Sequence, residues 1–488
     1  MSADIDPTNV LVVCVDEHNR NAMGCAGHPV VSTPNIDRLA RRGTRFTNAY
    51  TSSPICVPAR ASLATGLYVH QCRAWSSAEP FDGSVRGWAQ RLLDAGHRVV
   101  SVGKLHYRSS EDPNGFDPEI VPMHVYDGIG WSTALLRERV PVSPANARFA
   151  RDVGWGHSEY TAYDCEIADA ACNWLHKSAS ERSQRPWALF VSFVSPHYPL
   201  IAPEQYEELY PLERIEMPDA YEPAQRRRHA AVAMVERALG YDYFESEEHV
   251  LRARAAYYGL CSFADAQIGR LLAALEASGQ TDRTRIIFTS DHGEMLGNQG
   301  LWGKSVMFED SAGIPMIVAG PDIPAGAAVD TPVSLVDCHP TIIDAAGAPP
   351  EDGDELLPGV SLIDLAAGAR PDRTVLSEYH DGGSPTGMFM VRCDRWKYVC
   401  YPGYPPELFD LDADPSELQD LGQDPDFADV RRRCESRLRT VCDPEEVNAA
   451  AFADQAQRLA ALGGEAAVLT AGDFHERQSH TPVPTSAA

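Results

Sequence analysis

Short runs of apolar residues alternate with amphipathic stretches along most of this 488-residue chain. The first run, Asn9–Val15 (NVLVVCV), is almost unbroken, which is typical of a strand buried on both faces of a sheet. Amphipathic stretches such as Asn35–Arg42 and Ala256–Ala277 have the spacing of helices. Strands that alternate with helices in this way predict an α/β fold, with a large, mostly parallel sheet flanked by helices.

Four of the candidate strands lead into polar residues at their carboxyl ends. Asn9–Val15 leads into Asp16 and Glu17, His97–Val102 into Lys104 and His106, Trp187–Phe193 into His197, and Thr284–Thr289 into Asp291 and His292. In an open parallel sheet, ligands bind outside the carboxyl ends of the strands. Any one of these groups alone could be a helix cap or a turn, but four at one edge indicate a site. Carboxylates with one imidazole favour a divalent cation such as Ca²⁺ or Mg²⁺ over a thiolate-bound metal.

The chain is strongly acidic, with 42 basic and 69 acidic side chains and a net charge of −27. A field of this sign repels nucleic acid and anionic lipid, so no nucleic-acid partner is expected. No stretch of 18 apolar residues occurs, and the start of the chain lacks a secretory signal pattern, so no membrane association is expected. Twelve scattered cysteines without a CxxC pair are typical of reduced thiols, which predicts a cytoplasmic location.

A domain boundary is expected near Arg370–Asp372, which divides the chain into residues 1–370 and 371–488. Two strand candidates and two helix candidates follow it: Gly387–Cys393, Trp396–Tyr401, Phe427–Leu438 and Glu445–Leu462. The two strands flank a short turn, as in an antiparallel hairpin. We therefore predict a smaller C-terminal α+β subdomain that contains an antiparallel sheet, followed by a loose polar tail from about Gln478.

Cys56 lies in the segment PICVPARASLATG, residues 54–66. Pro58 suits an early helical position, which would place Cys56 at a helix N-terminus. Unpaired N–H groups and the helix dipole favour an anion there, and Arg60 falls one turn later and can fold back toward it. A lone cysteine is more often a small buried hydrophobic residue, but the Cys-x-Pro-x-Arg spacing argues against that interpretation.

Cys56-x-Pro58-x-Arg60, with the residues up to Gly66, resembles the signature of the type I sulfatases, relatives of alkaline phosphatase in which this cysteine is oxidised to Cα-formylglycine. Other segments resemble family motifs in family order: Asp16, Thr33–Ala40 (TPNIDRLA), Gly103–His106 (GKLH), Ser290–Gly297 (SDHGEMLG) and Leu301–Lys304 (LWGK). The resemblance runs from Asn9 to about Ala413, and it is strongest to choline sulfatases and phosphonate monoester hydrolases. It implies an alkaline-phosphatase-like fold.

The resemblance also implies a metal site. Asp16, Asp291 and His292 would hold a divalent cation, with the formylglycine made from Cys56 as a further ligand. Glu17 occupies a position where many relatives have Asp and closer ones have Gln, so it is expected to be a weaker ligand. Ca²⁺ is the expected cation, with Mg²⁺ and Mn²⁺ as alternatives.

The remaining motif residues would act on the substrate. Arg60 would hold the formylglycine oxygens, and Lys104 and His106 would surround its second hydroxyl group. His197 and Lys304 would face the sulfate and the departing oxygen. General acid catalysis by one of these two side chains would assist departure of the alcohol.

These implied roles predict a sulfatase that hydrolyses a small-molecule sulfate monoester to an alcohol and inorganic sulfate, after a maturation enzyme has converted Cys56 to formylglycine. One alternative is a phosphonate monoester or phosphodiester hydrolase with the same machinery. Charge does not separate these functions, since all three substrates are monoanions. A second alternative is a non-catalytic homologue with an unmodified cysteine, although every motif position is chemically competent. Assembly into a homo-oligomer is left open.

Two segments bear on the substrate. Near relatives often place Asp-Asn after an Arg-x-aromatic triplet, whereas here Arg73-Ala74-Trp75 is followed by Ser76-Ser77, so an amide that could touch the sulfate is missing.

The segment from about Val121 to Tyr163 has no clear period and is either an ordered insertion that lines a pocket or a surface loop. Within it, Gly130-Trp131 could begin an aromatic wall for a quaternary ammonium such as choline, or Trp131 could be a packing residue.

Overall fold

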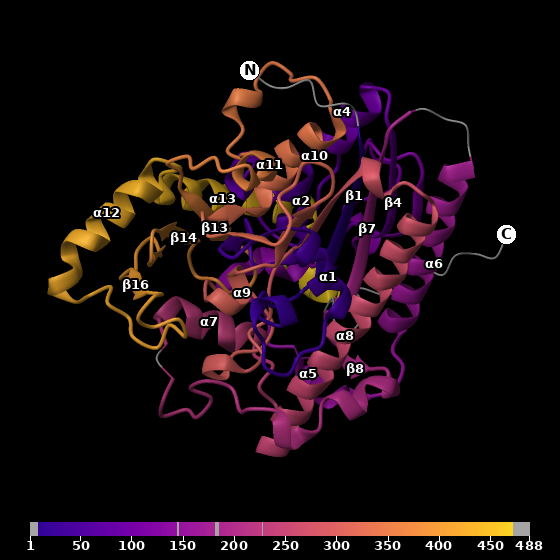
Figure 1. Ribbon diagram of the computed structural model, residues 1–488. Coiled ribbons are helices and arrows are strands. Elements are labelled where there is room, and N and C mark those ends of the chain that lie inside the picture. The colour runs from indigo at the N-terminus through magenta and orange to yellow at the C-terminus, as the bar shows by residue number, and fades with distance from the viewer. Residues whose placement is uncertain (1–7, 144–145, 181–184, 227, 472–488) are drawn as a thin grey trace.

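The computed structural model describes residues 8–143, 146–180, 185–226 and 228–471 (Figure 1). Its main element is an eight-stranded sheet. In spatial order the strands are β11 (Ala327–Val329), β2 (Gly43–Phe46), β10 (Met316–Ala319), β9 (Thr284–Ser290), β1 (Asn9–Asp16), β7 (Trp187–Pro196), β4 (Arg98–Lys104) and β5 (Glu119–Met123). The pairs that β10 forms with β9 and β2 are antiparallel, and the other neighbouring pairs are parallel. The predicted large, mostly parallel sheet is therefore confirmed.

Helices cover both faces of this sheet, and the alternating side chains of β1 supply both of the resulting cores. Val10, Val12 and Cys14 pack in a core with α2 (Cys56–Thr65), α4 (Trp88–Asp94), α10 (Cys338–Ala346) and α11 (Leu362–Ala366). Leu11, Val13 and Val15 pack in a core with α1 (Pro34–Arg42), α6 (Glu159–Ser180) and α8 (Glu247–Ala277), and Figure 1 shows α6 and α8 side by side. Every residue of β1 is buried, which explains its unbroken apolar sequence.

A separate four-stranded antiparallel sheet lies in the C-terminal region, as predicted. It consists of β13 (Val375–Tyr379), β14 (Met388–Cys393), β15 (Trp396–Cys400) and β16 (Glu407–Asp410), and helices α12 (Ala428–Arg439), α13 (Pro444–Ala461) and α14 (Glu465–Thr470) follow it. The hairpin of β14 and β15 is confirmed. The domain boundary at residue 370 stays a prediction, and the polar tail from Gln478 lies outside the described residues.

Two short strand pairs lie outside these sheets: β3 (Ala49–Tyr50) pairs with β12 (Val333–Ser334), and β6 (Val153–Trp155) pairs with β8 (Leu200–Ala202). The other α-helices of the described residues are α3 (Val69–Cys72), α5 (Ala147–Arg151), α7 (Ala230–Leu239) and α9 (Glu309–Ala312). Helix α8 begins at Glu247, before the predicted Ala256, because the Ser246 side chain caps it by accepting from the His249 N–H. None of the described helices is long and apolar enough to cross a membrane. All twelve cysteines lie in described residues and are unpaired.

A buried carboxylate joins α3 to the first strand of the C-terminal sheet. Glu378 on β13 accepts hydrogen bonds from the backbone N–H of His70 (2.9 Å) and from its Nδ1 (2.8 Å). Burial by itself would lower the pKa of His70, but the charge of Glu378 outweighs it and raises that pKa. Burial would likewise raise the pKa of Glu378, but His70 and His380 lower it to about 2.

We expect this contact to lose stabilising free energy as pH rises. The folded-state pKa of His70 is raised, so its contribution is complete below the unfolded value of about 6.5 and is lost as pH passes through the folded-state pKa. The measurement is the free energy of unfolding in urea between pH 6 and 9, for wild type and for His70→Gln. The stability gap between them should shrink with rising pH.

The matched control is His157→Gln, a substitution at an exposed histidine, which should leave the pH dependence of wild type unchanged. A gap for His70→Gln that stays constant or widens over this range would contradict the assigned ion pair.

Candidate active site

Four adjacent strands bring the predicted polar residues to one edge of the sheet. Strands β9, β1, β7 and β4 lie side by side, and all three of their pairings are parallel. Asp16 ends β1 and Glu17 follows it, Lys104 ends β4 and His106 lies just beyond it, His197 follows β7, and Asp291 and His292 follow β9. All of these side chains are buried. The structure therefore brings them together as the strand ends predict.

Helix α2 directs its N-terminus at this edge. It begins at Cys56, directly after an extended Ile55, and every residue in it is buried. Arg60, one turn later, turns its guanidinium back into the site. Its Nε donates to Oδ2 of Asp291 (2.7 Å), and its Nη1 donates to Oγ of Ser192 (2.9 Å) and to the Lys104 carbonyl (2.7 Å). The side chain at position 56 is thus held at a helix N-terminus beside a fixed cation.

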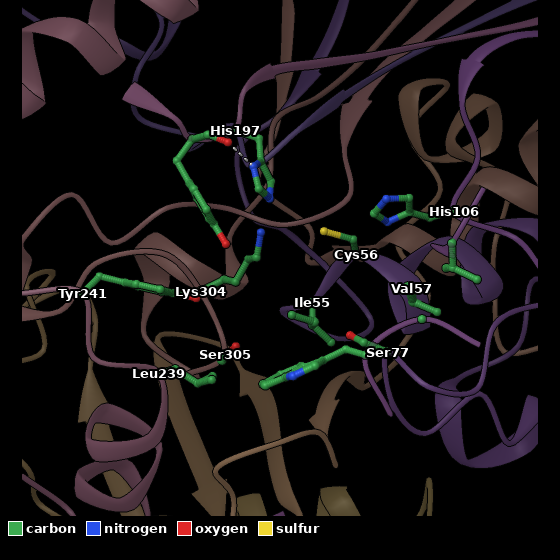
Figure 2. A pocket seen from close by; sticks show the side chains of 14 residues that line it. Ile55, Cys56, Val57, Ser77, His106, His197, Leu239, Tyr241, Lys304 and Ser305 are labelled. Atoms are coloured by element: carbon green, nitrogen blue, oxygen red, sulfur yellow. Dashed lines mark hydrogen bonds between the residues drawn. The ribbon is translucent and has the colours of Figure 1, made fainter. Parts of the chain in front are cut away.

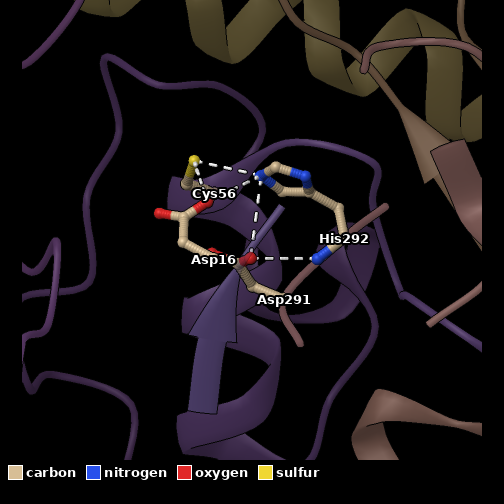
Figure 3. Close-up of side chains that lie close together, drawn as sticks. All are labelled: Asp16, Cys56, Asp291 and His292. Atoms are coloured by element: carbon tan, nitrogen blue, oxygen red, sulfur yellow. Dashed lines mark hydrogen bonds and ion pairs between the residues drawn. The ribbon is translucent and has the colours of Figure 1, made fainter. Parts of the chain in front are cut away.

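Asp16, Cys56, Asp291 and His292 form a buried cluster, with one donor atom from each within 4.8 Å of the others (Figure 3). Nε2 of His292 lies 3.1 Å from the Cys56 Sγ, 3.5 Å from Oδ1 of Asp16 and 3.7 Å from Oδ1 of Asp291. Its Nδ1 lies 3.1 Å from the Gly293 carbonyl, which assigns the proton to Nδ1 and a lone pair to Nε2. With Ca–O distances of about 2.3–2.6 Å, ligand atoms at right angles around one Ca²⁺ lie about 3.3–3.7 Å apart. Spacing and donor types therefore fit a divalent cation.

Positive side chains compensate the buried carboxylates. Lys104 Nζ pairs with Oδ2 of Asp16 and lies 4.0 Å from the Cys56 Sγ, and Nη2 of Arg60 lies 3.6 Å from Asp16 Oδ2. Burial by itself would raise the pKa of Asp16, but the charges of Lys104 and Arg60 lower it well below its usual value. Asp16 is therefore ionised. Burial raises the pKa of the Cys56 thiol to about 12, so an unmodified thiol is a poor nucleophile at neutral pH.

Glu17 pairs with two basic side chains next to this cluster. Its Oε2 lies 2.9 Å from Lys304 Nζ and 3.2 Å from Nε2 of His197. It also forms a second group of potential ligands with Asp16 and His197. Burial raises its pKa to about 8. Glu17 is not among the four residues of the first cluster, and its expected role as a weaker ligand stays a prediction.

A pocket opens onto Cys56 (Figure 2). It is lined by Ile55, Cys56, Val57, Ser77, His106, Val125, Gly130, Trp131, His197, Tyr198, Leu239, Tyr241, Lys304 and Ser305. Figure 2 shows Cys56 between His106 on one side and His197 with Lys304 on the other. The predicted substrate-facing residues therefore surround position 56 from both sides.

The insertion after Val121 contributes Val125, Gly130 and Trp131 to this pocket, which favours the pocket-lining interpretation over a surface loop. Trp131 also packs in a small apolar core, so it is a wall residue and a packing residue at once. Ser77, at the position where the family resemblance predicts an amide, also lines the pocket. Its N–H and Oγ donate to Asp381 (2.8 and 2.6 Å), which lies beyond β13.

Sequence reasoning missed several of these residues. Tyr198 and Ser305 directly follow the motif residues His197 and Lys304, and this adjacency was a usable signal. Ser192, which accepts from Arg60, lies inside a strand that was predicted only as a strand. Leu239 and Tyr241 lie at the end of α7, in a region without any motif, and only tertiary packing brings them to the pocket.

Comparison with known proteins agrees with this geometry. The Sulfatase family model matches residues 8–348, and a model of the N-sulphoglucosamine sulphohydrolase C-terminal region matches residues 297–443. The chain is 34% identical over 426 residues to a choline-sulfatase of Rhizobium meliloti (strain 1021), covering 86% of this chain and 83% of the relative. It is 28% identical over 478 residues to arylsulfatase K of Homo sapiens, covering 90% of this chain and 83% of that relative.

Among solved structures, a phosphonate monoester hydrolase of Agrobacterium radiobacter superposes with a TM-score of 0.73 at 26% identity, covering 89% of this chain and 95% of that one. The fold is thus alkaline-phosphatase-like. The chain belongs to the sulfatase family of the alkaline phosphatase superfamily and is a sulfuric ester hydrolase.

Proposed function

We propose that the protein hydrolyses a small-molecule sulfate monoester to an alcohol and inorganic sulfate, with a Cα-formylglycine made from Cys56 and a divalent cation. One observation carries the proposal: Cys56 lies at the N-terminus of a buried helix, within 4.8 Å of Asp16, Asp291 and His292, and also lines a pocket. A formylglycine-generating enzyme is then needed as a maturation partner. The oxygen-rich donor set supports Ca²⁺, with Mg²⁺ or Mn²⁺ as alternatives. Unpaired cysteines support a cytoplasmic location.

The cation would be held by Asp16, Asp291 and His292. When present, the cation polarises the sulfate ester and the modified residue at position 56 supplies the attacking oxygen. Arg60, fixed by three hydrogen bonds, orients the oxygens at position 56. Lys104 adds positive charge where negative charge develops on the sulfuryl oxygens, and preorganised charge of this kind is the main source of stabilisation in such sites.

Lys304 and His197 face the departing alcohol in this proposal, and Lys304 is the proton donor. Burial by itself would lower the pKa of Lys304, but the acidic groups that remain after Cys56 is modified, Glu17 and Asp16, raise it. Burial, with the charge of Lys304, lowers the pKa of His197, so this imidazole is neutral. His106 lies on the other side of Cys56 (Figure 2) and, in this proposal, accepts the proton of the second hydroxyl at position 56 when sulfate is released.

A phosphonate monoester or phosphodiester hydrolase is the second candidate. The solved structure of a phosphonate monoester hydrolase superposes on 89% of this chain. A sulfate monoester, a phosphonate monoester and a phosphodiester each carry one negative charge, so the same cationic groups suit all three.

The first test measures the covalent state of Cys56 and the substrate preference of the matured protein. Peptide mass spectrometry of the matured protein should show a loss of about 18 Da at Cys56, since the thiol becomes an aldehyde. Hydrolysis of an aryl sulfate should then be faster than hydrolysis of phenylphosphonate or an aryl phosphodiester. In the control, Cys56→Ala should lower the rate by roughly 10³-fold or more. Full activity with an unmodified Cys56 would overturn the nucleophile, and a faster phosphonate reaction would favour the second candidate.

The second test concerns the cation. Asp291→Asn should lower kcat and cation affinity together, the latter at least about 10-fold, because a ligand charge is lost. Glu17→Gln should have a smaller effect. The measurements are bound metal by mass spectrometry and the shift of Tm with added Ca²⁺. The control is Asp322→Asn, whose side chain is 85% exposed. Undiminished metal content in Asp291→Asn would remove Asp291 from the ligand set.

The third test separates acid catalysis from sulfate binding. Lys304→Ala should lower kcat/KM by about 10²–10⁴-fold for alkyl sulfates, whose leaving oxygen needs a proton, and much less for 4-nitrophenyl sulfate. The measurement is kcat/KM against leaving-group pKa for wild type, Lys304→Ala and His197→Ala. An equal loss across all leaving groups in Lys304→Ala would assign Lys304 to sulfate binding alone.

A further inference from the structure

We infer that the pocket selects sulfate esters of uncharged, apolar alcohols, such as aryl or arylalkyl alcohols, and that Trp131 determines this specificity. The inference rests on the proposed function, because it concerns the alcohol part of the same substrate. The imidazoles of His106 and His197 and the ammonium group of Lys304 lie around Cys56, where the sulfate would lie (Figure 2). The alcohol must then occupy the remainder of the pocket.

That remainder is rich in carbon. Its walls are formed mainly by Ile55, Val57, Val125, Trp131, Leu239 and Tyr241, and Ser77 and Ser305 add two hydroxyl groups. Among the described residues that line the pocket, none has a carboxylate, amide or guanidinium side chain. A sugar alcohol would bury several hydroxyl groups against these walls without enough partners, and each unpaired hydroxyl costs free energy. A flat or compact apolar group would instead gain from burial.

A cationic alcohol also fits these walls poorly. Lys304 Nζ lies 5.6 Å from the centroid of the Tyr198 ring, so an ammonium group already occupies a cation–π position on that ring. The nearby Glu17 side chain is in contact with Lys304 Nζ (2.9 Å) and Nε2 of His197 (3.2 Å) and is not part of the pocket lining. A quaternary ammonium would therefore enter beside an existing positive charge, without a free carboxylate in the lining to balance it.

The Trp131 wall is fixed before any substrate arrives. The backbone N–H of Trp131 donates to the Ser77 carbonyl (3.1 Å), and the Ser77 N–H and hydroxyl donate to the buried Asp381. Gly130 has a left-handed φ of 75°, and a Cβ there would lie 2.1 Å from the same carbonyl, so the approach requires glycine. The ring packs in one apolar core with Val468 of α14. A wall held in this way discriminates by shape, because it does not rearrange to suit each ligand.

The test uses three sulfates of primary alcohols, so that the leaving groups are comparable: 2-phenylethyl sulfate, choline sulfate and glucose 6-sulfate. Wild-type kcat/KM should be highest for 2-phenylethyl sulfate, by roughly 10-fold or more. Trp131→Ala should raise the KM for 2-phenylethyl sulfate about 10-fold, and the differences in kcat/KM among the three sulfates should become smaller. The KM for ethyl sulfate, which is too small to reach the wall, should change little. Trp131→Phe should restore most of the preference.

The matched control is Tyr126→Ala, on the same insertion but 42% exposed and outside the pocket lining; it should leave the preference unchanged. A wild-type preference for choline sulfate or glucose 6-sulfate would overturn the inference while leaving the proposed function intact. Equal losses for all esters in Trp131→Ala, including ethyl sulfate, would also overturn it. If the matured protein cleaves no sulfate ester, including 4-nitrophenyl sulfate, the proposed function fails, and the inference fails with it.

Discussion

Two carboxylates, Asp16 and Asp291, lie fully buried at the ends of neighbouring strands, and the arrangement of the site depends on how their charge is compensated. An unpaired buried charge costs several kcal/mol, so such a pair persists only with partners of opposite sign. Arg60 binds Asp291 at 2.7 Å, and Lys104 pairs with Asp16. Because Arg60 comes from α2 and Lys104 from β4, this charge balance joins the helix that carries Cys56 to three strands of the sheet.

The site and the pocket are built by different parts of the chain. The strand ends of the large sheet and Cys56 of α2 supply the charged cluster, whereas most of the apolar walls come from an insertion and from the end of α7, and Ile55 and Val57 beside Cys56 supply the rest. Chemistry and specificity can therefore vary separately in this fold. Substitutions at Trp131 or Leu239 change what the pocket accepts without moving Asp16 or Asp291, which lie in the rigid centre of the sheet.

Local patterns predicted the centre of the molecule well and its periphery poorly. The apolar run of β1 and the position of Pro58 sufficed for a buried strand and for a helix that begins at Cys56, because both depend on neighbouring residues. The contact of Ser77 with Asp381 spans 304 positions and leaves no local pattern. The pairing of Glu17 with Lys304 is equally long-range, so no motif could show that this carboxylate lies against a lysine.

The order of the strands in the sheet has a consequence for how the protein is made. β1 and β9 pair in the folded sheet, but Asp291 and His292 leave the ribosome long after Cys56. Until β9 has been synthesised, the cluster cannot close over Cys56, which is only 4% exposed in the finished fold. If Cys56 is modified as proposed, synthesis itself would provide an interval in which the modifying enzyme can reach the cysteine. A chain that completes its fold before Cys56 has been modified would bury the unmodified thiol.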